Sequence, residues 1–242
     1  MTGPCCPDRA DRDGVGPRGY GSIVERPAVA NLSAVESERL DLGAGAWVDI
    51  VRGWVADPDE AYRALVANVA WQQGRVFRYE RWIDEPRLGG AWSPSRPPPH
   101  PVVLEAHHAL QQRYRVRFDG CGLAWYRDGR DSVAFHRDRD LRWLDDTVIA
   151  LVTLGQRRPW YLRPRSARYD HDTPNKGASH DLSPGPGDLI VMGGRTQTAW
   201  EHSVPKTDPR VGGRISLQWR WTSRQGPQEL GGSYRKPVHF SR

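Results

Sequence analysis

The sequence predicts a mainly β protein of the α+β class, in which helices precede a β-sandwich or β-barrel. After Gly120, short runs rich in β-branched and aromatic residues alternate with turn-forming clusters, a pattern typical of sandwiches and barrels. Before Gly120, two stretches carry apolar residues at helical spacing. The length of 242 residues allows one large domain or two small ones.

Two helices are expected in the first half of the chain. Asp57 is a good N-cap and Pro58 suits the first helical position, so we expect a helix that extends to about Trp71. Its apolar residues recur four apart, at Ala61, Leu65 and Val69. A second helix over about 102–114 follows the proline-rich linker 97–101.

Seven strands are expected in the second half. They are Leu123–Tyr126, Ser132–His136, Thr147–Leu154, Trp160–Arg163, Asp188–Met192, Ala199–Val204 and Arg214–Thr222. The polar, Gly- and Pro-rich stretch 165–187 is expected to be a surface loop, so His171 and His180 are interpreted as ordinary loop residues. Residues 1–30 are expected to be disordered, because they contain too few apolar residues to compensate for the entropy of ordering.

The composition argues for a soluble cytoplasmic protein with no membrane span. No apolar run approaches the 20 or so residues that cross a bilayer, the first residues lack the apolar core of a secretory signal, and three cysteines cannot form a disulfide framework. The net charge is +6, and since only three of the 35 cationic residues are lysine, the other 32 are arginine. This excess suits a polyanionic partner, but a G+C-rich genome explains it equally well.

One short motif has metal-binding character. His136 and Asp138 are two apart, so on a strand they point to the same face. A histidine from a distant strand, such as His202, would complete a two-His, one-carboxylate facial triad for ferrous iron. Taken alone, a His-x-Asp triplet is more often a polar surface pair than a metal site, since so short a motif occurs by chance.

The last expected strand has two different faces. Period-two alternation places Ile215, Leu217, Trp219 and Trp221 on an apolar face and Arg214, Ser216, Gln218 and Arg220 on the other. Buried arginines need an anion, so this second face either binds a ligand or is the solvated outer face of an edge strand.

Four motifs in order resemble the AlkB-type Fe(II)/2-oxoglutarate dioxygenases. Residues 125–140 resemble the iron-binding signature of that family, residues 200–206 its second-histidine motif, and Arg214–Arg220 its closing strand with an arginine at each end. Glu85-Pro-Arg-Leu88 resembles the start of its nucleotide-recognition lid. The four motifs cover about residues 82–222, and together they are far more specific than any one of them.

The resemblance implies a double-stranded β-helix, or jelly roll, with the helices packed outside. It implies a catalytic domain over residues 45–225, a disordered tail and lead-in over 1–44, and a C-terminal tail over 226–242. It assigns the Fe(II) ligands to His136, Asp138 and His202. It places Tyr126, Arg214, Ser216 and Arg220 around 2-oxoglutarate, and Trp92, Asp140 and Arg163 near the substrate.

The resemblance implies an enzyme that consumes O2 and 2-oxoglutarate and dealkylates N-alkylated bases in DNA or RNA. Such an enzyme needs a flipped or single-stranded base, and we expect it to act as a monomer. Two departures from the family pattern are visible: Ala124 stands where many members have an asparagine that binds 2-oxoglutarate, and Ser216 replaces an amide. Two alternatives stay open, namely the same chemistry on a protein or small molecule and a non-catalytic nucleic-acid-binding module.

Overall fold

A computed structural model describes residues 27–230 apart from 79, 171 and 173–176. The N-terminal stretch 1–26, His171 and the C-terminal stretch 231–242, for which a tail or loop was expected, lie outside the described residues. Among the residues described, no helix has the length and apolar character to cross a membrane.

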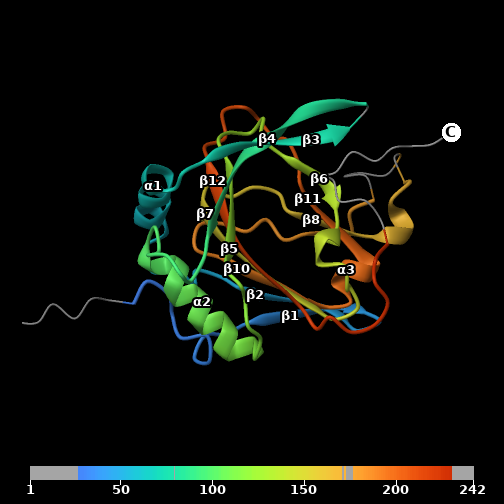
Figure 1. Ribbon diagram of the computed structural model, residues 1–242, viewed down its shortest axis with the longest axis horizontal. Helices are drawn as coiled ribbons and strands as arrows, with labels where there is room; N and C mark the ends of the chain where they lie inside the picture. The colour runs from blue at the N-terminus through green and yellow to red at the C-terminus, as the bar shows by residue number, and fades with distance from the viewer. Residues whose placement is uncertain (1–26, 79, 171, 173–176, 231–242) are drawn as a thin grey trace, which may run out of the picture.

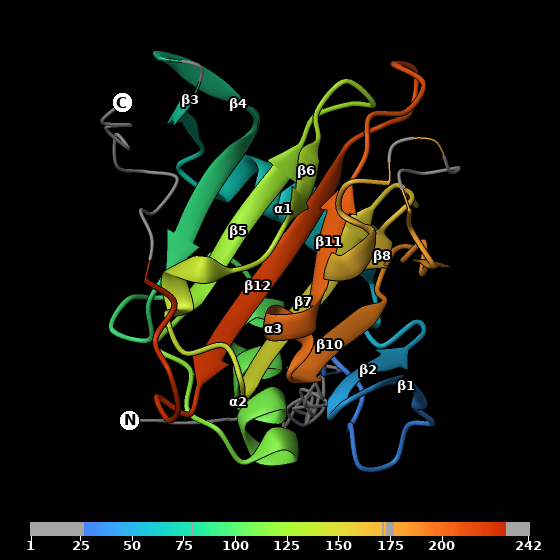
Figure 2. The ribbon, with the colours of Figure 1, turned by 90° about the vertical axis from the view of Figure 1, so that its right-hand side faces the viewer.

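The chain forms two antiparallel sheets that face each other (Figures 1 and 2). The larger sheet has the order β1-β2-β10-β7-β12-β5-β4-β3 and the smaller has the order β6-β11-β8-β9. The strands of the larger sheet are β1 (Glu38–Gly43), β2 (Ala46–Val51), β3 (Gln72–Arg78), β4 (Arg81–Trp92), β5 (Cys121–Tyr126), β7 (Thr147–Gly155), β10 (Leu189–Gly194) and β12 (Arg214–Thr222). Those of the smaller sheet are β6 (Val133–His136), β8 (Tyr161–Pro164), β9 (His180–Asp181) and β11 (Trp200–Val204). This arrangement confirms the predicted jelly roll.

The helices cover the outer face of the larger sheet. They are α1 (Pro58–Asn68) and α2 (Pro101–Tyr114), and both lie on the side away from the smaller sheet (Figure 1). Asp57 caps α1 by accepting a hydrogen bond from the backbone N–H of Glu60, as the sequence predicted. The helix ends at Asn68 rather than Trp71, because the backbone becomes extended at Val69 and the following residues pair as strand β3.

Two apolar clusters lie on opposite faces of the larger sheet. The outer cluster joins the helices to the sheet and includes Leu65, Leu110, Leu217 and Trp219. The inner cluster lies between the two sheets and includes Ile149, Leu151, Trp160 and Leu162. Strands β2, β5, β7 and β10 therefore contribute residues to two separate interiors.

Five strands were not predicted: the short β9, and four strands that form two hairpins. Strands β3 and β4 form a hairpin that projects beyond the rest of the larger sheet (Figure 2). Strands β1 and β2 form a second hairpin at its other edge. Strand β1 falls within residues 1–44, where a tail and lead-in were expected, and Val29 and Leu32 from the same stretch are buried. The folded part of the chain therefore begins well before residue 45.

Three short segments also differ from the prediction. The stretch 165–187 contains a 3-10 turn, η2 (Arg165–Ala167), and strand β9. A one-turn helix, α3 (Thr196–Ala199), precedes β11, so that strand starts at Trp200. A second 3-10 turn, η1 (Arg139–Leu141), begins directly after Asp138.

Candidate active site

Three side chains from neighbouring strands meet between the two sheets. His136 ends β6, Asp138 follows two residues later, and His202 lies in β11 directly opposite His136 in the antiparallel register. One candidate ligand atom from each residue lies within 4.8 Å of the other two. Two imidazoles and one carboxylate at this spacing suit a divalent transition metal and leave coordination positions open.

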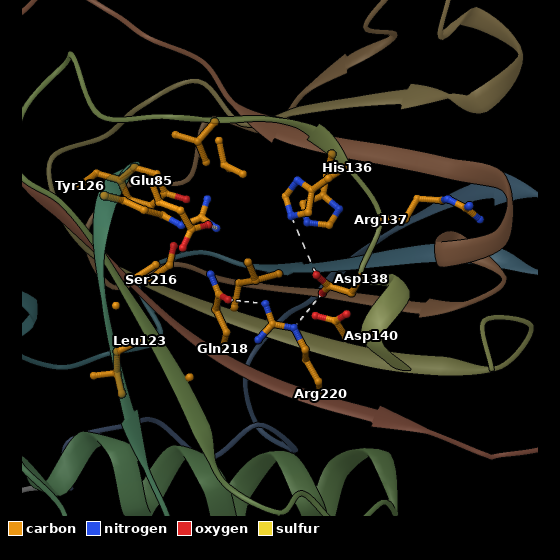
Figure 3. Close-up of a pocket in the computed structure, with 18 of the residues that line it drawn as sticks. Glu85, Leu123, Tyr126, His136, Arg137, Asp138, Asp140, Ser216, Gln218 and Arg220 are labelled. Carbon is orange, nitrogen blue, oxygen red and sulfur yellow. Dashed lines mark hydrogen bonds and ion pairs between the residues drawn. The ribbon is translucent and has the colours of Figure 1, made fainter. Parts of the chain in front are cut away.

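Hydrogen bonds orient two of these side chains. The Nδ1 atom of His136 lies 2.9 Å from the carbonyl oxygen of Ala134, so Nδ1 carries the proton and Nε2 is free to bind a metal. Arg220 reaches the triad from strand β12, and its Nε donates to Oδ2 of Asp138 at 2.8 Å (Figure 3). The other carboxylate oxygen, Oδ1, faces Nε2 of His136 at 3.9 Å. The bond from Arg220 thus fixes the carboxylate while Oδ1 stays available.

The electrostatic environment keeps the triad in its metal-binding protonation state. Burial and the neighbouring His136 lower the pKa of His202 to about 3, and burial likewise lowers the pKa of His136. Although burial opposes its ionisation, Arg220 and the two histidines hold the pKa of Asp138 below its usual range. Two neutral imidazoles and one carboxylate are the forms that bind metal.

The triad lies in a cavity of about 400 Å³ between the sheets. This volume suits a small ligand. The wall on the side of the larger sheet includes Tyr126, Ser216, Gln218 and Arg220, and Figure 3 shows Arg220 and Gln218 beside Asp138. The predicted polar face of strand β12 therefore turns toward the interior, and its interpretation as a solvated outer face is wrong.

Arg214 lies behind this wall, completely buried. Its Nη2 makes long hydrogen bonds of 3.3 Å to Thr153 Oγ1 and 3.4 Å to Ser216 Oγ, and the guanidinium carbon lies 5.8 Å from the ring centroid of Tyr126. Its Nε and Nη1 have no hydrogen-bond partner within the described part of the chain. Burial lowers the pKa of Arg214 to about 10, so it stays cationic at neutral pH. A buried guanidinium with unused donors is suited to a ligand carboxylate.

The departures from the family pattern lie beside this arginine. Ala124 of β5 is paired with Ser216 of β12, and both line the cavity. A methyl group and a hydroxyl therefore stand where amide side chains would offer more hydrogen bonds. Arg214 and Tyr126 are left as the principal polar groups at this end.

Trp92, which was expected near the substrate, does not line the cavity. Trp92 ends strand β4 and is 6% exposed, its indole Nε1 donates to the carbonyl of Arg96, and its ring lies edge-on to His107 of α2. It belongs to the outer apolar cluster. At this position of β4 the side chain points to the helix-covered face of the larger sheet, so it packs under α2 and does not line the cavity.

Arg163, which was also expected near the substrate, does not line the cavity. It lies opposite Glu201 in the register of β8 and β11, and its Nη2 and the Glu201 carboxylate form an ion pair of 2.7 Å. Since Glu201 precedes His202, strand alternation directs the pair to the face away from the cavity. Both side chains are largely buried, so the pair joins β8 to β11 within the smaller sheet.

Asp140 and the lid motif do lie at the cavity. Asp140 is exposed and lines it from η1 (Figure 3). Glu85 and Arg87 line it from strand β4, and they form an ion pair of 3.1 Å. The β3–β4 hairpin therefore starts at the cavity and projects outward from it.

Three residues near the triad were missed by sequence reasoning. Trp160 stacks on His202 with ring centroids 5.4 Å apart. Gln197 is buried in α3 and accepts a hydrogen bond from the backbone N–H of Asp138, and Thr153 contacts Arg214. No local pattern marks these residues, because each acts through a contact between distant parts of the chain.

The fold, the triad and the buried arginine together define a class of enzyme. The sequence model of the 2OG-Fe(II) oxygenase superfamily matches residues 58–220, so this chain belongs to that superfamily. Its members are dioxygenases that use Fe(II), 2-oxoglutarate and O2. The unused donors of Arg214 and the two-His, one-carboxylate set fit these groups.

Within the superfamily the chain is AlkB-like. It is 27% identical over 212 residues to the alpha-ketoglutarate-dependent dioxygenase alkB homolog 3 of Mus musculus, an alignment that covers 82% of this chain and 72% of that protein. It is 26% identical to the Bos taurus homolog 3, over 68% of this chain and only 61% of that protein. It is 28% identical to the DNA oxidative demethylase ALKBH2 of Arabidopsis thaliana, over 82% of this chain and 74% of that protein.

A solved structure shares the fold. A prolyl hydroxylase from Trichoplax adhaerens, in complex with a hypoxia inducible factor peptide, matches 72% of this chain and 83% of its own with a TM-score of 0.51. Its sequence identity is 13%, so the likeness concerns the fold alone.

Proposed function

We propose that this protein removes alkyl groups by oxidation from nitrogen atoms of bases in nucleic acid. The observation that carries the proposal is the cavity itself. It contains the metal-binding triad, has the buried Arg214 behind one wall, and is lined in part by the β3–β4 hairpin. The similarity to alkB homolog 3 and to proteins named DNA oxidative demethylase supports the choice of substrate. The arginine-rich composition is compatible with a polyanionic partner.

In this proposal His136, Asp138 and His202 hold Fe(II). The bond from His136 Nδ1 to the Ala134 carbonyl orients the imidazole, and the bond from Arg220 orients the Asp138 carboxylate. Such partners of metal ligands set ligand orientation and basicity. When bound there, Fe(II) would supply oxygen activation, so that O2 and 2-oxoglutarate would give succinate, CO2 and one oxygen atom inserted into a C–H bond of the alkyl group.

The co-substrate is held from the larger sheet. Arg214 would bind the distal carboxylate of 2-oxoglutarate through its unused Nε and Nη1 donors. Tyr126 and Ser216 line the cavity beside it and complete this end. Because the guanidinium is buried and stays charged, the carboxylate would be bound away from competing water.

The substrate would be met by the residues of η1 and β4 that line the cavity. Asp140, Glu85 and Arg87 line the cavity from η1 and β4, and these residues would contact the alkylated base. The base must leave its stack to reach the metal. The hydroxylated alkyl group on nitrogen then collapses, releasing an aldehyde and the repaired N–H.

The test is a panel of oligonucleotides, single- and double-stranded, each with one N-methylated base or its unmodified counterpart. With Fe(II) and 2-oxoglutarate, we expect methylated strands to yield the restored base, formaldehyde and succinate in equal amounts. Succinate formation that no methylated strand stimulates would overturn the nucleic-acid proposal and favour a protein or small-molecule substrate. Failure to bind Fe(II) and 2-oxoglutarate would instead indicate a non-catalytic binding module.

A further inference from the structure

The chain returns to the metal-binding loop after the last strand. Gln228 and Glu229 follow the end of β12 by a few residues and lie beyond the part that the superfamily matches. Gln228 forms a β-bridge with Trp143, and the backbone N–H of Glu229 donates to the carbonyl of Arg142 at 2.6 Å. A segment that was expected to be a tail is therefore attached just after Asp138.

The carboxylate of Glu229 contacts the two residues that flank Asp138. Its Oε1 accepts a hydrogen bond of 3.1 Å from Arg137 Nη2 and lies 3.3 Å from Arg139 Nε in an ion pair. Arg137 is 8% exposed, so Glu229 neutralises a buried charge. In Figure 3 the guanidinium of Arg137 extends away from His136 and Asp138, toward this second set of contacts.

A chain of hydrogen bonds connects Glu229 to the ligand residue. Arg137 Nη1 donates to the backbone carbonyl of Gln197, and the side chain of Gln197 accepts from the backbone N–H of Asp138 at 2.9 Å. The turn that follows ends at Arg142, whose φ of 65° is unfavourable for a residue with a side chain. The bond from Glu229 N–H to the Arg142 carbonyl holds the backbone at that point.

We propose that Glu229 is a positioning residue for the metal site, acting through Arg137 and Arg139 to fix the backbone that presents Asp138. The proposal rests on the assignment of Asp138 as a metal ligand in the proposed function. Outer partners of metal ligands tune affinity because they fix where the ligand atom lies. Without the Glu229 carboxylate, Arg137 keeps a buried charge with a weaker partner, and the loop on both sides of Asp138 loses its anchor.

The experiment compares metal affinity in four variants of the full chain. Mn²⁺ is titrated into Glu229→Gln, Glu229→Asp, Glu60→Gln and Asp138→Ala, with free Mn²⁺ followed by electron paramagnetic resonance, and the melting temperature of each metal-free protein is recorded. Glu60→Gln is the matched control, because it removes the carboxylate of an α1 residue from its contact with His100, the N-cap of α2. We also expect the KM for 2-oxoglutarate to stay near the wild-type value in Glu229→Gln.

The Mn²⁺ affinity of Glu229→Gln should fall roughly five- to tenfold, near the lower end of the effect for outer partners of metal ligands. Glu229→Asp should recover part of this loss, Glu60→Gln should match the wild type, and Asp138→Ala should bind Mn²⁺ more than about 100-fold more weakly than the wild type. Wild-type affinity in Glu229→Gln, with or without a lower melting temperature, would overturn the inference. If Asp138→Ala bound Mn²⁺ as tightly as the wild type, the site assignment itself would fail.

Discussion

The two faces of strand β12 are built for different purposes. On the helix-covered face, Ile215, Leu217 and Trp219 are completely buried in the outer apolar cluster. On the face toward the smaller sheet, Arg214 is equally buried but has unused hydrogen-bond donors, and Arg220 holds Asp138. Adjacent residues of one strand therefore belong either to the packing of the fold or to the active site.

The difference shows how the fold separates stability from chemistry. Burial of apolar side chains on the outer face stabilises the protein, whereas a buried guanidinium with unsatisfied donors reduces stability until an anion binds. A shift of register by one residue would exchange the two faces. Substitutions on the outer face should therefore lower the free energy of unfolding, and those on the inner face should lower ligand affinity.

The largest effect is expected at the metal triad. Asp138→Ala removes the carboxylate ligand, so Fe²⁺ or Mn²⁺ affinity should fall by more than the roughly 100-fold that marks the loss of an outer partner, and 2-oxoglutarate turnover should stop. Isothermal titration with Mn²⁺ measures the affinity. Asp140→Ala, two residues away, should retain metal affinity. Iron-dependent turnover in Asp138→Ala would contradict the assignment.

A similarly large effect is expected from Trp219→Ala, but on the stability of the fold and not on metal affinity. The indole is completely buried among the residues that join the helices to the sheet, so the free energy of unfolding should fall by about 3–5 kcal/mol. Urea denaturation measures this loss. The protein that remains folded should bind Mn²⁺ with nearly wild-type affinity. An unchanged stability, or a selective loss of metal binding, would show that the two faces are not separate.

Arg220→Gln, a substitution on the inner face of β12, should have an intermediate effect on metal affinity. The substitution removes the charged donor to Asp138 Oδ2, and metal affinity should fall roughly 10- to 100-fold, as for other partners of ligating side chains. Mn²⁺ titration is again the measurement, with the urea midpoint as control for folding. Equal affinity in the variant and the wild type would mean that Asp138 needs no orientation by Arg220.

A small pH effect is expected on the outer face. His107 is 4% exposed, its Nδ1 has no hydrogen-bond partner among the described residues, and burial together with His108 lowers its pKa. Below pH 6.5 the unfolded chain then binds more protons at this residue than the folded protein, so stability falls as the pH decreases from 6.5. His107→Phe should reduce the slope of stability against pH by at most about 1.4 kcal/mol per unit. An unchanged slope in urea melts at pH 5, 6 and 7 would contradict this account.

Much of the architecture was predictable because the alternation along the strands is strong. Strand β12 was predicted with its observed bounds, and its two faces were assigned correctly. The first four strands were missed: Pro86, Gly89 and Gly90 interrupt β4, β1 is largely exposed and rich in charged residues, and the apolar run of β2 is only six residues long. Their pairing depends on neighbours distant in the sequence, which no local pattern records.

In the candidate site, only the residues that belong to short sequence motifs could be predicted reliably. His136, Asp138, His202 and Arg214 stand in short motifs, and the structure brings the first three together. Trp92 and Arg163 were assigned only by the family resemblance, and they lie outside the four motifs; the face toward which such a strand residue points depends on the packing of both sheets. Glu229 and Gln197 act across long stretches of chain, so their roles become visible only in three dimensions.

The central claim is that one cavity holds Fe(II) at the triad and the distal carboxylate of 2-oxoglutarate at Arg214. An anaerobic titration of the Fe(II)-loaded protein with 2-oxoglutarate, followed by the visible charge-transfer band of the chelate, tests it directly. Arg214→Leu should reach the same final band but need on the order of 100-fold more 2-oxoglutarate, as expected for the loss of one partner of a buried charge pair, while its stability stays equal to or above that of the wild type. Half-saturation at the wild-type concentration in Arg214→Leu would contradict the account.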